Sequence, residues 1–113
     1  MLSSKKSRIL IADADSTFLR SITQSLKKDG YEISTAAESD EALRLFRSFD
    51  PHAVLLGAQL ADQSSLKTLE RLKQLRPSLP IILLAGPEET GALFLMSKAG
   101  IDDYMGRDRK SVV

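Results

Sequence analysis

The sequence predicts an α/β fold in which short strands alternate with helices in a single domain. Three short segments are almost continuously apolar and lack the polar–apolar alternation of a strand that faces water, which indicates strands buried on both faces, and two weaker apolar segments complete a set of five. Four segments between them carry apolar residues at helical spacing, and glycines or prolines stand at the joints. This alternation predicts a parallel sheet covered by helices on both faces.

The predicted elements follow one another without a linker or an internal repeat. The strands are residues 9–12, 31–36, 53–56, 81–85 and 101–105, of which the second and fifth are less apolar. The helices are marked by Phe18, Leu19, Ile22 and Leu26, by Ala42, Leu45, Phe46 and Phe49, by Leu66, Leu69, Leu72 and Leu75, and by residues 92–96. Right-handed crossovers leave few strand orders, and we expect a flavodoxin-like, doubly wound five-stranded sheet of order 2-1-3-4-5.

Composition excludes several classes of protein. The 113 residues suffice for one domain, and the chain has no cysteine and a single histidine, His52, so it has no disulfide, no thiol nucleophile and no cysteine-based or His-cluster metal site. The longest apolar runs are far shorter than the ~20 residues of a membrane span. We therefore expect a cytoplasmic protein without a membrane partner.

Charge argues against direct nucleic-acid binding. The net charge is +1, but between residues 9 and 106 acidic residues outnumber basic residues by 14 to 10. The basic residues of the predicted third helix are interleaved with Glu70 and indicate an ordinary solvated face. No basic stripe suits a nucleic acid.

Ligands of such sheets bind beyond the carboxyl ends of the strands, at the point where the strand order reverses. The segments expected at this edge are 13–15, 57–59, 85–86 and 106–107. They carry the candidate functional residues.

Six segments together resemble the receiver domain of two-component response regulators. They are residues 9–15, 30–33, 40–43, 51–56, 80–84 and 100–104, in the order and spacing of that family. The resemblance predicts an N-terminal tail over residues 1–7, a receiver-like domain over 8–107 and a non-family tail over 108–113. It also implies a histidine kinase, an output domain or another receiver as protein partner.

The family's phosphorylation chemistry falls on altered residues. The resemblance places its acidic, metal-binding pair on Asp13 and Ala14, its phosphoacceptor aspartate on Gly57, its strand-four hydroxyl on Ala85 and its lysine on Arg107. Phosphoryl transfer to a carboxylate needs a nucleophile, a hard cation and donors to the phosphoryl oxygens. Gly57 offers no nucleophile. Asp13 is at most a weak, vestigial metal ligand, so we expect no cofactor and weak or absent Mg²⁺ binding.

These residues indicate a degenerate receiver that acts as a phosphorylation-independent protein-interaction module and not as an enzyme. Tyr104 matches the family's switch aromatic, three residues before Arg107. Because Ala85 leaves room where the family has a hydroxyl, we expect an inward Tyr104 ring and a fixed partner surface on the fourth helix and fifth strand.

Several polar residues also have purely structural interpretations. Asp15 precedes Ser16 and Thr17 and is expected to cap a helix, while Asp13 suits an ion pair with Arg107. His52 is expected to face solvent. Asp102 and Asp103 are expected at a solvated loop edge.

A small haloacid-dehalogenase-like phosphatase is the alternative interpretation. Its first motif resembles residues 13–17, with Asp13 as nucleophile and Asp15 as general acid, and Asp102 and Asp103 as late metal-binding acids. Ala85 and Gly86 offer no hydroxyl for phosphate, and the chain leaves no room for a cap domain. A flavodoxin is disfavoured because Ser16 and Thr17 are only a small part of the hydroxyl-rich loop that binds phosphate in that family.

The C-terminal residues depart from the family, which continues with a fifth helix. Here residues 108–113 coincide with one reading frame of a sequencing-adapter oligonucleotide, and an assembly artefact is one explanation for them. We expect the fifth helix to be missing or truncated. Loss of its cover would expose apolar surface at about 25 cal/mol per Å² and favour marginal stability or a homodimer.

Overall fold

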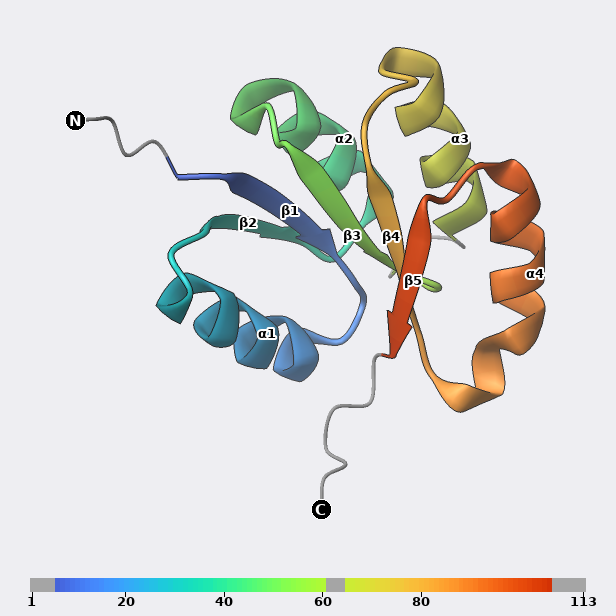
Figure 1. Cartoon of the computed structure of the whole chain (residues 1–113), viewed down its shortest axis with the longest axis horizontal. Coiled ribbons are helices and arrows are strands. Elements are labelled where there is room, and N and C mark those ends of the chain that lie inside the picture. Colours follow the sequence, from blue (N-terminus) through green and yellow to red (C-terminus); the bar gives the residue numbers. More distant parts are fainter. Residues whose placement is uncertain (1–5, 61–64, 107–113) are drawn as a thin grey trace.

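The computed structural model describes residues 6–60 and 65–106, which form an alternating series of strands and helices (Figure 1). The strands are β1 (Arg8–Ala12), β2 (Glu32–Ala36), β3 (Ala53–Gly57), β4 (Ile81–Ala85) and β5 (Asp103–Gly106). The helices are α1 (Ser16–Lys28), α2 (Ser39–Phe49), α3 (Ser65–Leu75) and α4 (Thr90–Ala99), with a short 3₁₀ helix η1 (Pro87–Glu89) before α4. The five strands are parallel and lie in the order β2-β1-β3-β4-β5, which confirms the predicted flavodoxin-like sheet.

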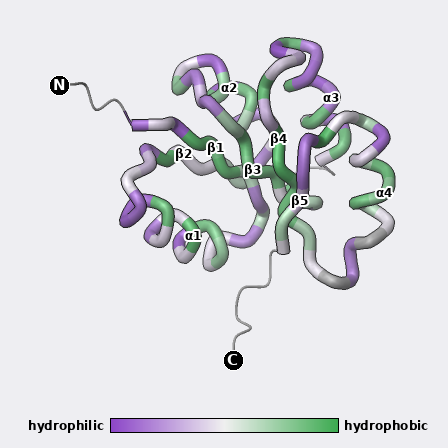
Figure 2. The backbone as a smooth tube through the Cα atoms, in the orientation of Figure 1, coloured by the Kyte–Doolittle hydropathy of each residue, from purple (hydrophilic) through white to green (hydrophobic). Residues whose placement is uncertain are grey.

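Helices cover both faces of the sheet, α1 on one face and α2, α3 and α4 on the other (Figure 1). Side chains alternate along β1, so Leu10 packs in the core under α2, α3 and α4, whereas Ile11 packs under α1. Apart from Arg8 at the start of β1, the central strands β1, β3 and β4 are apolar, and they carry the hydrophobic colour across the middle of the molecule (Figure 2). Burial on both faces explains why their sequences lack alternation.

Local capping sets the helix boundaries. The Asp15 carboxylate accepts hydrogen bonds from the backbone N–H groups of Thr17 and Phe18, which confirms Asp15 as the N-cap of α1. Gly100 ends α4 in the left-handed conformation with φ 115°, as expected of a glycine after a helix. Asp50 adopts the same region, with φ 52°, at the end of α2.

The structure departs from the predicted elements near the C-terminus. The fifth strand begins at Asp103, not at residue 101, and η1 was not expected from the sequence. The predicted tail over 108–113, the fate of a fifth helix and Arg107 lie outside the described residues. None of the helices within 6–60 and 65–106 is long and apolar enough to cross a membrane.

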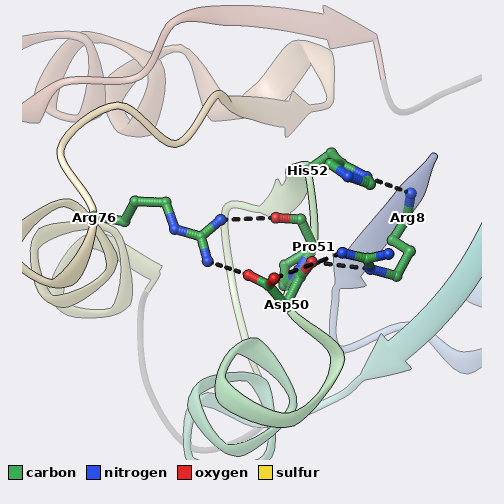
Figure 3. A network of polar contacts seen from close by, with 5 residues as sticks. All are labelled: Arg8, Asp50, Pro51, His52 and Arg76. Carbon is green, nitrogen blue, oxygen red and sulfur yellow. Dashed lines mark hydrogen bonds and ion pairs between the residues drawn. The ribbon is translucent and has the colours of Figure 1, made fainter.

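A polar cluster ties together the amino-terminal edge of the sheet (Figure 3). The Arg76 guanidinium forms an ion pair with the Asp50 carboxylate, donates to the Pro51 carbonyl at 2.9 Å, and lies 4.9 Å from the Phe46 ring centroid. Arg8 donates to the Asp50 carbonyl at 3.0 Å. These contacts join β1, the end of α2 and the end of α3 around the left-handed Asp50.

His52 belongs to the same edge. Its side chain is exposed, as expected, but Nδ1 accepts a hydrogen bond of 2.9 Å from the Arg8 backbone N–H, while the His52 N–H donates to the Arg8 carbonyl at 2.8 Å. The histidine thus fixes where β3 begins beside β1.

We expect Arg76→Met to lower the free energy of unfolding by about 1 kcal/mol. Methionine keeps an apolar side chain near Phe46 but removes the partly exposed guanidinium that binds the Asp50 carboxylate and the Pro51 carbonyl. Urea denaturation monitored by circular dichroism measures the difference. Arg71→Met on the same helix is the control and should leave stability almost unchanged. Equal effects of the two substitutions would contradict a clamping role for Arg76.

Asp102 does more than the solvated loop residue expected from the sequence. Its Oδ2 accepts hydrogen bonds from the Ile81 backbone N–H at 2.8 Å and from the Lys73 ammonium at 3.0 Å. The Ile81 N–H first, and the Lys73 charge after it, hold the pKa of Asp102 below its ordinary value of 3.8. The carboxylate therefore joins α3 to the starts of β4 and β5.

Because its pKa is lowered in the folded protein, Asp102 stabilises the fold above about pH 4, and this contribution disappears as the pH falls through the lowered pKa. Asp102→Asn should lower the thermal midpoint at pH 7 and flatten its decline between about pH 4 and pH 2. Thermal melts across this range, with Glu70→Gln as control, test the expectation. An unchanged acid limb in Asp102→Asn would refute it.

Candidate functional site

The candidate site lies where the carboxyl ends of β1 and β3 meet. Ala12 pairs with Leu56 in the ladder between these strands, so the residues that follow, Asp13 and Gly57, lie side by side. Ala85 ends the next strand along the edge. The register therefore brings together Asp13 and Gly57, two residues that the sequence analysis placed at the same edge of the sheet.

The Asp13 side chain is buried, with 2% of the residue exposed. Its Oδ1 accepts a hydrogen bond of 2.9 Å from the Asp15 N–H, and its own N–H donates to the Ala36 carbonyl at 3.0 Å. A Cβ atom added to Gly57 would lie 2.8 Å from Asp13 Cγ and closer still to Oδ2, nearer than real Cβ contacts come. The Asp13 carboxylate thus occupies the volume in which a side chain at position 57 would begin.

Ser65 closes the site from the side of α3. The serine is fully buried; its hydroxyl donates to the Gly57 carbonyl, and its N–H donates to the Ala58 carbonyl at 3.3 Å. The sequence analysis did not identify this role. The sequence does not show that Ser65 is buried; its burial in the structure explains the contact, because a buried hydroxyl needs a partner.

A hollow of about 230 Å³ opens at the carboxyl ends of β1 and β3. It is lined by Asp13, Ala14, Asp15, Ala58, Gln59 and Glu89. Glu89, also missed by the sequence analysis, comes from η1 and accepts a hydrogen bond of 2.7 Å from the Gly86 N–H. The hollow is acidic, because three of its lining residues are Asp13, Asp15 and Glu89.

The donors at this edge do not fit a magnesium site. Mg²⁺ takes near-octahedral oxygen ligands, usually one or two carboxylates with water and substrate oxygens. Here Asp13 Oδ1 accepts the Asp15 N–H and Asp15 Oδ1 caps α1, while Ala14 and Gly57 have no side-chain oxygen. Within residues 6–60 and 65–106, no three histidine, cysteine, aspartate or glutamate side chains are grouped so that they could hold a metal ion.

Tyr104 corrects one sequence prediction. The residue is 57% exposed, so its ring does not take the buried inward position that was expected. Tyr104 lies opposite Leu83 on the edge strand β5, where β4 is its neighbour on one side. Ala85 leaves space but offers no hydrogen-bond partner, and a buried phenol without a partner is costly.

The arrangement argues against the phosphatase interpretation. Asp102 precedes β5 and binds the first residue of β4, so it lies at the amino-terminal edge of the sheet. Asp13 lies at the carboxyl edge. Asp102 cannot complete a metal site with Asp13, and Asp15 is engaged as a helix cap.

Comparison with known proteins agrees with the fold. Residues 9–110 match the family of response regulator receiver domains. The structure is similar to a CheY-like receiver domain protein from Methanospirillum hungatei JF-1, with a TM-score of 0.83, 30% identity and coverage of 96% of this chain and 85% of that one. The chain belongs to the response regulator receiver domain family.

Curated relatives include full-length regulators. The chain is 29% identical over 86% of its length to the probable transcriptional regulatory protein TcrX of Mycobacterium tuberculosis. It is 30% identical over 87% of its length to the cell cycle transcriptional regulator CtrA of Caulobacter vibrioides. In both cases it spans 42% of the relative.

The contact between Asp13 and Gly57 can be tested by adding one methyl group. Gly57→Ala should lower the free energy of unfolding by about 1–3 kcal/mol, because the new Cβ overlaps the buried Asp13 carboxylate. Combining it with Asp13→Ala should recover part of this loss relative to the sum of the single effects. Urea denaturation of the four proteins in this cycle gives the coupling.

Gly106→Ala is the matched control, since it lies at the end of a strand at the same edge and a Cβ there has no neighbour within 4 Å. It should be nearly neutral. Additive effects of Gly57→Ala and Asp13→Ala would contradict the steric pairing.

Proposed function

We propose that this chain is a phosphorylation-independent receiver, a protein-interaction module of two-component signalling that is not an enzyme. The observation that carries the proposal is the Asp13 carboxylate in the space where a side chain of residue 57 would begin. Gly57 has no nucleophilic oxygen, and Ala14 and Ala85 have none with which to bind a metal or a phosphoryl group.

Weak or absent Mg²⁺ binding is part of this proposal. Asp13 is the one carboxylate that remains at the family's metal-binding positions, and it faces Gly57 inside the protein. Its Oδ1 already accepts a hydrogen bond from the Asp15 N–H, which would compete with a cation for that oxygen. Both features support a site that does not assemble the cation on which the family's chemistry relies.

A protein partner is the second part of the proposal. The curated relatives are transcriptional regulators of more than twice this length, which supports an output domain, a histidine kinase or another receiver as the partner. On α4, Phe94 is 62% and Leu95 54% exposed, and the exposed Tyr104 lies on β5. Exposed large apolar side chains are typical of interaction sites, so α4 and β5 are the proposed contact region, in a heteromer or a homodimer.

Acetyl phosphate with Mg²⁺ should leave the intact mass, oligomeric state and thermal midpoint of the protein unchanged. Mass spectrometry, light scattering and thermal melts check these three outcomes. A receiver domain that retains its acceptor aspartate is the positive control. A hydroxylamine-labile phosphoryl group on the chain would overturn the proposal, and its location on Asp13 would restore the phosphatase interpretation.

Restoring the acceptor alone should fail. Gly57→Asp should remain poorly phosphorylated, because its Cβ meets the Asp13 carboxylate and because Ala14 and Ala85 still lack ligand oxygens. The variant that combines Gly57→Asp with Ala14→Asp and Ala85→Thr supplies the missing groups and is the informative comparison. Efficient phosphorylation of Gly57→Asp by itself would show that the rest of the site is competent.

A further inference from the structure

The strand β2 presents an unpaired edge at one side of the sheet. It pairs with β1 alone, and no other strand of the described residues lies beyond it. The Glu32 N–H donates to the Ser7 carbonyl, and the Ala36 carbonyl accepts from Asp13, so the backbone groups of these alternate residues point toward β1. The N–H and C=O groups of Ile33 and Thr35 therefore point outward, where a further strand could pair with them.

A groove runs along this edge between β2 and α1. It has a volume of about 420 Å³ and is lined by Ser16, Leu19, Arg20, Thr23, Gln24, Lys27, Ile33 and Thr35. The Ile33 and Thr35 side chains lie on the α1 face of β2, as the packing of Ile33 in the core beneath α1 shows. The groove thus lies beside the same two residues whose backbone groups are available for pairing.

Two further observations indicate what the groove would accept. Arg20 and Lys27 are exposed along it, and neither forms an ion pair with another residue in the described part of the chain. The Thr23 hydroxyl is buried and has no hydrogen-bond partner there. A carboxylate entering the groove would meet two cations and could accept a hydrogen bond from this hydroxyl.

We propose that β2 binds an extended, acidic segment of a partner protein, which adds to the sheet as a further strand. Its backbone would pair with the outward groups of Ile33 and Thr35, and alternate side chains would enter the groove toward Arg20 and Lys27. Two cations beside a strand edge suit a peptide with acidic residues at every second position. They are too few for the phosphate backbone of a nucleic acid.

The probe is a short fluorescent peptide that alternates valine and glutamate, with a valine–lysine peptide of the same length as its control. Fluorescence anisotropy with the intact chain should show saturable binding of the acidic peptide, weakened by salt, and no binding of the basic one. Equal binding of both peptides, or of neither, would overturn the proposal.

Two pairs of variants locate the binding. Thr35→Pro removes an outward N–H without removing a hydrogen bond to β1, and Thr35→Val keeps that N–H in a side chain of similar shape. Proline should weaken peptide binding at least about tenfold, and valine should not. Charge reversal of both Arg20→Glu and Lys27→Glu should reverse the preference between the peptides, whereas Lys67→Glu on α3 should not.

Circular dichroism and thermal melts establish whether each variant is folded. If Thr35→Pro does not fold, the variant that combines Arg20→Glu and Lys27→Glu tests the site by itself. Peptide binding that survives both Thr35→Pro and the charge reversal refutes the site. Concentration-dependent self-association that Thr35→Pro abolishes, without peptide binding, would instead make a second copy the occupant and overturn the acidic partner. These outcomes do not depend on phosphate, so the proposed function can fail or hold independently.

Discussion

The register between β1 and β3 is the constraint on which the site depends. Ala12 pairs with Leu56 at the end of the ladder, and this pairing places the next two residues, Asp13 and Gly57, side by side. A parallel sheet brings the strand ends to a common edge. Here the Asp13 carboxylate occupies the space that a side chain on Gly57 would need. Ser65 then holds the Gly57 carbonyl from the other side, so the backbone at this edge is fixed from α3 as well as from β1.

The two edges of the sheet use their charged groups differently. At the amino-terminal edge, Arg8, Arg76 and Lys73 are each bound to carboxylates or carbonyls and tie helices to strand starts (Figure 3). At the carboxyl edge Asp13, Asp15 and Glu89 accept hydrogen bonds from nearby backbone N–H groups. The charged groups of the first edge therefore join helices to strands, whereas the carboxylates of the second hold the local backbone.

Much of the fold was predictable because burial on both faces leaves a direct trace in sequence: residues 9–12, 53–56 and 81–85 are apolar without alternation, and each is a strand in the structure. The features that were missed depend on contacts between distant residues. Asp102 was expected to be a solvated loop residue because its contacts with Ile81 and Lys73 are not visible in the sequence, and the contact of Ser65 with Gly57 is not visible there either. Tyr104 was misjudged because available space was considered without the cost of burying a hydroxyl.

The close approach at Gly57 also makes the effect of a substitution there depend on which other residues have already changed. A larger residue at position 57 would meet the buried Asp13 side chain and would cost stability unless Asp13 had already changed or moved. Because of the packing around this one glycine, the order in which substitutions are made matters as much as their identity.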